Sequence, residues 1–103
     1  MNAGIIGIGR YIPDLVITNF DLEKRMDTTD EWIRTRTGIQ ERRVAPEGTD
    51  TSDMAYEAAR EAIENAGLSP EEIGMIITAT VTPDRSFPSV SCMLQERDRK
   101  SVV

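Results

Sequence analysis

The stretch TSDMAYEAAREAIENAGLSPEEIGMIITATV, residues 51–81, decides the fold class. Over residues 51–66 the apolar side chains recur with the 3.6-residue period of a helix, and Gly67 supplies a helix stop. Residues 69–72 (SPEE) form a capping box with proline at the first helical position, which predicts one further turn. Residues 73–81 are apolar and β-branched without strict alternation, as in a parallel strand covered on both faces. A helix, a turn and a buried strand in this order predict an α/β fold.

The residues before this stretch predict two strands and two short helices. Residues 4–13 (GIIGIGRYIP) place isoleucines among glycines and stop at a proline, which predicts a short buried strand. We expect Asn19 to cap a helix that runs through Met26. The remaining predictions are a helix over 30–36 capped by Thr28 or Thr29 and ended by Gly38, an edge strand over 39–44 and a loop over 45–50.

Composition excludes several classes of function. The chain has 103 residues with 39% hydrophobic and 29% charged residues, which is typical of one globular domain or a piece of one. A formal charge of −6 argues against nucleic acid as a partner. One cysteine allows no internal disulfide, and neither a secretory signal nor an apolar stretch of about 20 residues is present. We therefore expect a soluble, cytoplasmic protein with no membrane partner.

The residue types present also limit the chemistry. Without histidine there is no Ser-His-Asp or Cys-His arrangement, and a single cysteine cannot build a thiolate metal cluster. We expect Pro88 to open a last helix through about Arg97, with Val90, Met93 and Leu94 on one side. Cys92 lies inside that helix with no basic residue beside it, so we expect a buried structural thiol. The sequence predicts no catalytic residue and no metal site.

The least usual segment is DEWIRTRTG, residues 30–38. The only tryptophan, Trp32, precedes Arg36 by four residues, so the two side chains share one helix face. An indole beside a guanidinium can hold a planar base and a phosphate. The alternative is structural, with Trp32 covering a neighbouring helix and Arg36 capping helix carbonyls.

These residues carry a family resemblance. Residues 27–43 (DTTDEWIRTRTGIQERR) closely resemble the amino-terminal signature of the β-ketoacyl-acyl-carrier-protein synthase III family. Residues 4–25 (GIIGIGRYIPDLVITNFDLEKR), the helix over 51–66 and residues 79–96 (ATVTPDRSFPSVSCMLQE) are similar to the same family. The resemblance extends over about residues 2–97.

The resemblance implies a thiolase-like, layered αβα fold of two similar halves, with residues 1–97 forming part of the amino-terminal half. It further implies a cytoplasmic homodimer that works as an acyltransferase of fatty-acid biosynthesis and lipid metabolism. Such an enzyme takes an acyl group from acyl-coenzyme A onto a cysteine and condenses it with malonyl-acyl-carrier protein, with loss of carbon dioxide. Acyl-coenzyme A is a substrate, and neither a metal nor any other cofactor is implied.

The resemblance also assigns roles to five residues. Trp32 would stack on the adenine of coenzyme A, while Thr28, Arg36 and Thr37 would line the nucleotide and phosphate portion of that site. Phe87 would reach across the dimer interface and help to close the acyl pocket of the partner subunit. Its alternative role is that of a core aromatic residue at the start of a helix.

Other parts of the chain depart from the family. The nucleophilic cysteine, the histidine and the asparagine of the family have no counterpart here, and Cys92 matches a non-catalytic helix position, so we expect the chain alone to be inactive. Residues 98–103 (DRKSVV) read as a foreign tail that matches one reading frame of a sequencing adapter. Two alternatives stay open. The parent could be a related polyketide or quinolone priming synthase, or the chain could be a small coenzyme A-binding protein without catalysis.

Overall fold

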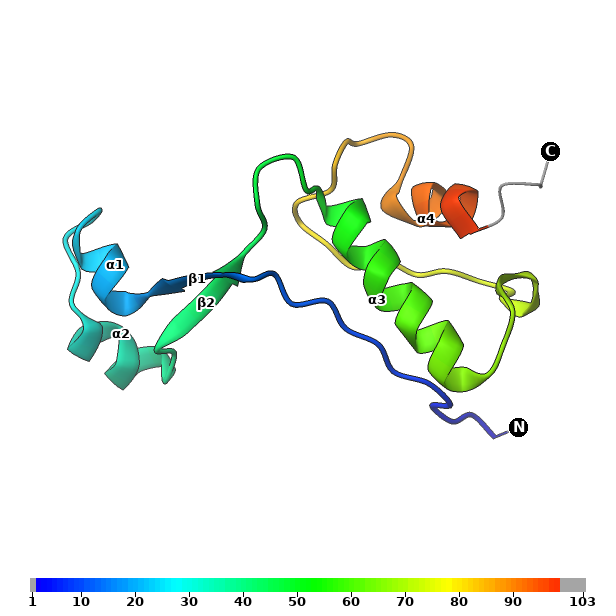
Figure 1. The fold of residues 1–103 in the computed structure, drawn as a ribbon, viewed down its shortest axis with the longest axis horizontal. Helices are drawn as coiled ribbons and strands as arrows, with labels where there is room; N and C mark the ends of the chain where they lie inside the picture. The colour runs from blue at the N-terminus through cyan, green and yellow to red at the C-terminus, as the bar shows by residue number, and fades with distance from the viewer. Residues whose placement is uncertain (1, 99–103) are drawn as a thin grey trace. The chain divides into compact units, whose positions relative to one another are not determined.

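The computed structural model describes residues 2–98, so residues 99–103 of the predicted foreign tail lie outside the described part. The described residues form two compact units (Figure 1). Residues 12–48 form the first, which we call the hairpin unit. Residues 2–11 together with 49–98 form the second, which we call the α3 unit. Each unit is described by itself.

The hairpin unit is built on two antiparallel strands, β1 (Leu15–Thr18) and β2 (Glu41–Val44). Leu15 pairs with Val44 and Thr18 with Glu41, and helices α1 (Asn19–Glu23) and α2 (Asp30–Thr37) connect the strands. The edge strand predicted over 39–44 is thereby confirmed as β2. The sequence prediction missed β1, although three of its four residues, Val16, Ile17 and Thr18, are β-branched and favour strands.

Helix α1 begins one residue earlier than expected. The Thr18 hydroxyl accepts the Asp21 N–H at 3.2 Å, and the Asp21 carboxylate accepts the Thr18 N–H at 2.9 Å. These reciprocal hydrogen bonds form a capping box. Both contacts with Thr18, first the one from its backbone N–H, lower the pKa of Asp21. The prediction that Asn19 caps this helix is wrong, because Asn19 is its first residue, and the helix ends at Glu23 instead of Met26.

Helix α2 follows its prediction closely. Thr29 caps it by accepting the Trp32 N–H at 3.1 Å, and Gly38 ends it in the left-handed conformation with φ of 73°. Asp30 and Glu31 lie in the first turn and Arg34 and Arg36 in the last, as the helix dipole favours.

The α3 unit contains the long helix α3 (Thr51–Ala66), the short 3₁₀ turn η1 (Pro70–Glu72) and the last helix α4 (Val90–Asp98). The bounds of α3 and η1 are as predicted. Helix α4 begins at Val90 and not at Pro88, because the Ser89 hydroxyl accepts the Cys92 N–H at 3.3 Å. Helices α3 and α4 pack together, and the buried apolar side chains of the described residues are Val90 and Leu94 of α4.

Residues 2–11 run extended along α3 (Figure 1). Gly7 and Gly9 lie against the alanine face of the helix, and a β-carbon on Gly7 would come within 2.7 Å of the Ala66 β-carbon. Asn65 donates a hydrogen bond to the Ile8 carbonyl at 2.9 Å. The predicted strand over 4–13 is wrong for this structure, because the described residues supply no ladder for this extended backbone.

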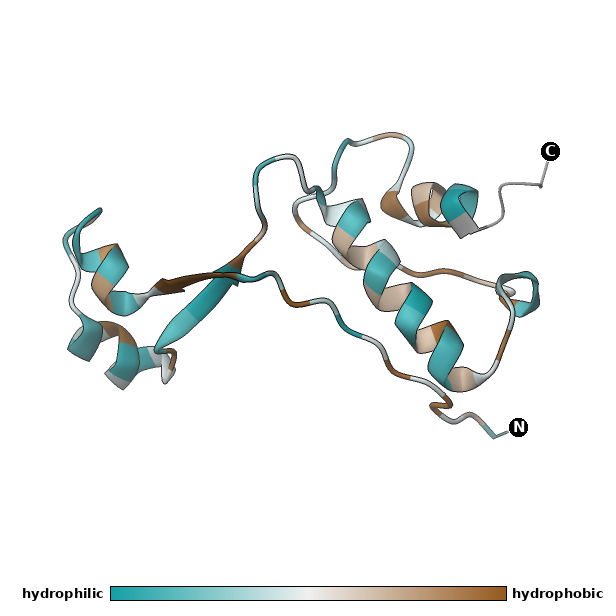
Figure 2. Ribbon diagram, in the orientation of Figure 1, coloured by the Kyte–Doolittle hydropathy of each residue, from teal (hydrophilic) through white to brown (hydrophobic). Residues whose placement is uncertain are grey.

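The strand predicted over 73–81 does not form either. The segment is extended and largely hydrophobic (Figure 2), and Met75, Ile77 and Val81 are exposed. A strand requires a neighbouring strand at about 4.8 Å, and the described residues form a single sheet, the pair β1–β2. The β-branched pattern indicated a sequence that can form a strand, but a strand also needs a second strand beside it, which the pattern does not predict.

Candidate nucleotide-binding site

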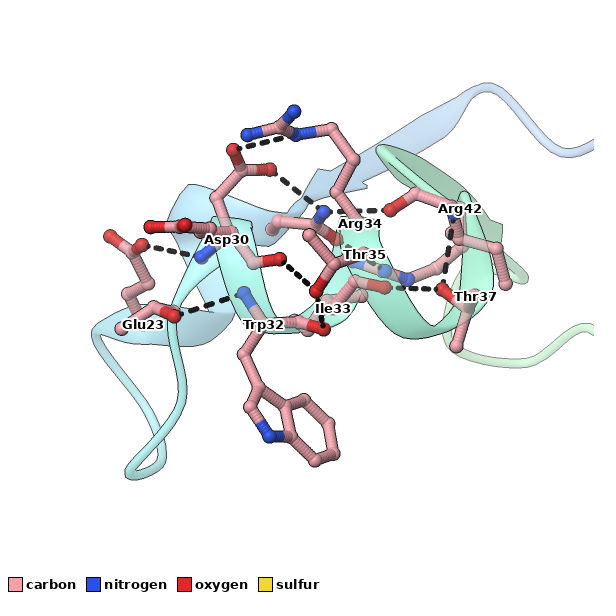
Figure 3. Close-up of polar contacts among 12 residues, drawn as sticks. Glu23, Asp30, Trp32, Ile33, Arg34, Thr35, Thr37 and Arg42 are labelled. Atoms are coloured by element: carbon pink, nitrogen blue, oxygen red, sulfur yellow. Dashed lines mark hydrogen bonds and ion pairs between the residues drawn. The ribbon is translucent and has the colours of Figure 1, made fainter.

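The candidate site lies on α2 of the hairpin unit. The start of this helix is fixed by two contacts besides its cap. The Glu23 carboxylate accepts the Asp30 N–H at 2.7 Å, and Arg34 forms an ion pair with Asp30 at 3.4 Å (Figure 3). Arg34 of the last turn is thereby engaged with Asp30 of the first turn, and Arg36 is the other basic residue of the last turn.

Trp32 and Arg36 form the centre of the site. The indole of Trp32 points away from the polar contacts around α2 (Figure 3), and the residue is 54% exposed. The guanidinium carbon of Arg36 lies over this ring at 4.8 Å from its centroid, within the range of a cation–π contact. The predicted shared helix face is confirmed. The structural alternative, with Trp32 covering a neighbouring helix, does not agree with this exposure.

A surface hollow lies beside the indole. Its lining residues come from the turn between α1 and α2 and from the start of α2: Met26, Asp27, Thr28, Thr29 and Trp32. The Thr28 N–H donates to the Met26 carbonyl at 2.9 Å, which fixes this turn. Two of the predicted site residues, Thr28 and Trp32, thus share one hollow. The sequence did not single out Met26 or Asp27, whose place in the hollow follows from the turn.

Thr37 has a different setting from the other predicted residues. Its hydroxyl donates to the Ile33 carbonyl at 2.7 Å and accepts the Ile39 N–H at 3.1 Å. Both contacts hold the carboxyl end of α2, where the chain turns towards β2. In this structure Thr37 is engaged with the backbone and does not line the hollow beside Trp32.

A buried asparagine holds α2 in place through its side-chain hydrogen bonds. Asn19 is fully buried and donates to the Asp30 carboxylate at 2.9 Å and to the Ile39 carbonyl at 2.7 Å. Arg42 of β2 donates to the Asn19 side-chain oxygen at 2.7 Å. Asn19 therefore ties both ends of α2 to β2. Sequence reasoning missed this role, because its partners lie 11, 20 and 23 residues away along the chain.

Phe87 and Cys92 belong to the α3 unit. Phe87 is 89% exposed, so its alternative role as a core aromatic residue does not hold in this structure. Cys92 is exposed as well, and the prediction of a buried thiol is wrong. Cys92 lines a surface hollow together with Ser91, Gln95 and residues 73–76.

Residues 2–98 contain neither a metal cluster nor a membrane-spanning helix. No group of three or more histidine, cysteine, aspartate or glutamate side chains in this range could hold a metal ion. No helix in the same range is long and apolar enough to cross a membrane.

Comparison with known proteins decides the family. No family model matches the chain. A β-ketoacyl-[acyl-carrier-protein] synthase III from Geobacillus kaustophilus is 68% identical over 97 residues, which cover 94% of this chain and 31% of the relative. A synthase III from Bacillus anthracis is 65% identical over 96 residues, covering 93% and 31%. The chain belongs to the β-ketoacyl-acyl-carrier-protein synthase III family. It spans about a third of the length of these synthases III.

Solved structures show the same thiolase-like fold, of which this segment of a synthase III is a part. The crystal structure of the synthase III from Aquifex aeolicus has a TM-score of 0.87 and 56% identity, covering 96% of this chain and 32% of that chain. A priming β-ketosynthase of the R1128 polyketide pathway has a TM-score of 0.85 and 34% identity, covering 90% and 28%. The extended segments 2–11 and 73–81 therefore lie along a thiolase-like chain path even where no ladder is present.

Proposed function

We propose that this chain supplies the nucleotide end of the coenzyme A site of a β-ketoacyl-acyl-carrier-protein synthase III. The observation that carries the proposal is the exposed indole of Trp32. Arg36 lies over its ring, and the surface hollow that Thr28 helps to line lies beside it. An aromatic face stacks on a planar base, and a guanidinium donates a planar pair of hydrogen bonds to phosphate oxygens. Thr37 contributes by holding the end of the helix that carries Arg36.

The whole enzyme, in this proposal, condenses acyl-coenzyme A with malonyl-acyl-carrier protein and so begins fatty-acid synthesis. Support comes from the identity to synthases III over nearly the whole chain. The enzyme is a cytoplasmic homodimer in which Phe87 closes the acyl pocket of the partner subunit, and it uses no metal or other cofactor. The described residues contain no histidine and one exposed cysteine, so we expect the chain alone to transfer no acyl group from labelled acetyl-coenzyme A.

One alternative has support of its own. The R1128 priming synthase has nearly the same TM-score as the Aquifex aeolicus enzyme, so a polyketide priming role fits the same fold. The sequence identity favours the fatty-acid enzyme, with 56% against 34% for these two structures. A stand-alone protein that binds coenzyme A without catalysis would use the same Trp32 face.

A chimeric synthase tests the proposed site. Residues 1–97 replace the matching segment of the Geobacillus kaustophilus relative, with which they share 68% identity. Trp32→Ala should raise the KM for acyl-coenzyme A about 5-fold to 100-fold and leave kcat nearly unchanged, because base stacking of roughly 1–3 kcal/mol acts equally in the ground and transition states. Phe20→Ala, which also removes an exposed aromatic residue of the hairpin unit, is the matched control.

The acyl donor provides the second control. An acyl-pantetheine thioester lacks the nucleotide, so its KM should be nearly indifferent to Trp32→Ala. If Trp32→Ala impairs this truncated donor as much as acyl-coenzyme A, Trp32 is structural and the proposed nucleotide site is wrong.

A further inference from the structure

The first turn of α3 holds a loop that lies 32 residues further along the chain. Ser52, which is almost completely buried, donates its N–H to one oxygen of the Asp84 carboxylate at 2.8 Å and its hydroxyl to the other at 2.5 Å. The neighbouring Thr51 hydroxyl donates to the Thr82 carbonyl at 2.5 Å. Three hydrogen bonds thus fix residues 82–84 to the start of the helix.

These contacts are stronger than ordinary loop contacts. The first N–H groups of a helix lack intrahelical acceptors, and the helix dipole favours a negative charge there. The Asp53 carboxylate of α3 accepts the Asp50 N–H at 2.8 Å, which forms part of the helix cap. The Ser52 N–H is not used by this contact and donates to Asp84. Hydrogen bonds to a charged acceptor are about twice as strong as neutral ones. The Ser52 hydrogen bonds lower the pKa of Asp84, so its carboxylate is ionised at neutral pH.

The far end of the same loop is fixed as well. Val90 and Leu94 are buried where α4 packs on α3, and the hydroxyls of Thr78 and Ser91 share a hydrogen bond at 2.7 Å. The five residues 85–89 therefore connect two anchored ends, and Phe87 is the middle one. It is 89% exposed.

We propose that the Asp84–Ser52 contact is a positioning device that presents Phe87 for its place in the acyl pocket of the partner subunit, and so helps to set acyl-chain selectivity. The inference rests on the proposed function, which assigns Phe87 to that pocket. Asp84 itself does not touch the substrate in this proposal. Its carboxylate fixes the point at the start of α3 from which residues 85–89 run to α4, and a misplaced Phe87 would leave the pocket open to longer chains.

The test uses the chimeric synthase and the ratio of kcat/KM for hexanoyl-coenzyme A to that for acetyl-coenzyme A. Asp84→Ala should change this ratio about 3-fold to 10-fold in the direction of Phe87→Ala, and the double variant should change it no further than Phe87→Ala alone. Ser52→Ala is a milder variant that removes one hydrogen bond and should give a smaller change of the same sign. Asp84→Asn, which retains an acceptor oxygen, should restore part of the native ratio.

A control at the same helix end separates positioning from general destabilisation. Asp53→Asn weakens the cap at Asp50 and the ion pair with Arg97, but it removes no contact with residues 82–84. It should leave the selectivity ratio unchanged. If Asp53→Asn changes the ratio as much as Asp84→Ala, or if Asp84→Ala and Phe87→Ala act additively, the positioning role is refuted.

The outcomes also distinguish this inference from the proposed nucleotide site. An unchanged ratio for Asp84→Ala overturns the positioning role while the KM effect of Trp32→Ala still supports the coenzyme A site. An unchanged ratio for Phe87→Ala overturns the positioning role too, because Phe87 would then have no effect on acyl-chain selectivity for Asp84 to control. A KM that is indifferent to Trp32→Ala refutes the nucleotide site and does not affect the selectivity measurement.

Discussion

The guanidinium carbon of Arg36 lies 4.8 Å from the centroid of the Trp32 ring, one helical turn away on α2. The planar cation is thereby held beside the surface that we propose for the adenine. A lysine at position 36 would keep the charge but not the planar fork.

We therefore expect Arg36→Lys in the chimeric synthase to raise the KM for acyl-coenzyme A about 5-fold or more, which corresponds to roughly 1 kcal/mol. The turnover number should stay close to that of the parent. Steady-state kinetics with acyl-coenzyme A and with acyl-pantetheine measure this effect, and equal impairment of the two donors would contradict a phosphate role for Arg36.

The hydrogen bonds of Asn19 predict a large cost for its removal. Asn19→Leu leaves the Ile39 carbonyl and the Arg42 guanidinium each without one hydrogen-bond partner, and a buried polar group left unsatisfied costs about 1–3 kcal/mol. Denaturant unfolding of the chimera should show a loss of that order. Phe20→Ala, at the exposed neighbouring position, should stay within about 0.5 kcal/mol, and a similar loss for both variants would contradict the role of the Asn19 network.

The contact between residues 2–11 and α3 predicts a position-specific effect of alanine. A β-carbon at Gly9 would run into the backbone of Ala58 and Ala62, whereas one at Gly4 would meet nothing within 4 Å. Gly9→Ala should therefore destabilise the chimera by about 1–3 kcal/mol and increase hydrogen exchange over residues 2–11. Gly4→Ala is the matched control, and it should leave both quantities nearly unchanged.

The Asp84 contact predicts a dependence on pH. Because the Ser52 hydrogen bonds, with help from the charge of Arg85, lower the pKa of Asp84, the contact contributes its full stability above the ordinary pKa of aspartate. That stability is lost as the pH falls through the lowered value. Carboxyl-carbon NMR should show Asp84 titrating below an ordinary aspartate, and Ser52→Ala should return the midpoint towards the ordinary value. An unshifted midpoint in the parent would contradict the contact.

Local patterns predicted α2 and α3 well. The apolar spacing from Thr51 to Ala66 and the stop at Gly67 are properties of neighbouring residues, and α3 has those bounds in the structure. Trp32 and Arg36 meet for the same reason, since a separation of four residues places them on one helix face. The positions of Thr28 and Trp32 in one hollow follow from the short connection between α1 and α2.

Distant partners explain what the sequence could not predict. The strand-forming residues 73–81 form no strand here, because a ladder depends on a second segment that local pattern does not reveal. Asn19 looked like a helix cap, yet its hydrogen bonds reach residues up to 23 positions away. Cys92 looked like a buried thiol, but burial depends on which face of α4 another element covers.

The extended course of residues 2–11 along α3 has a consequence for the order of events during synthesis. Asn65, which holds the Ile8 carbonyl, follows it by 57 residues. At a translation rate of about 5–20 residues per second, the amino-terminal segment leaves the ribosome roughly 3–11 s before its helical partner exists. The earliest-made part of this chain, with its three isoleucines, must therefore stay unaggregated in the growing nascent chain until α3 emerges.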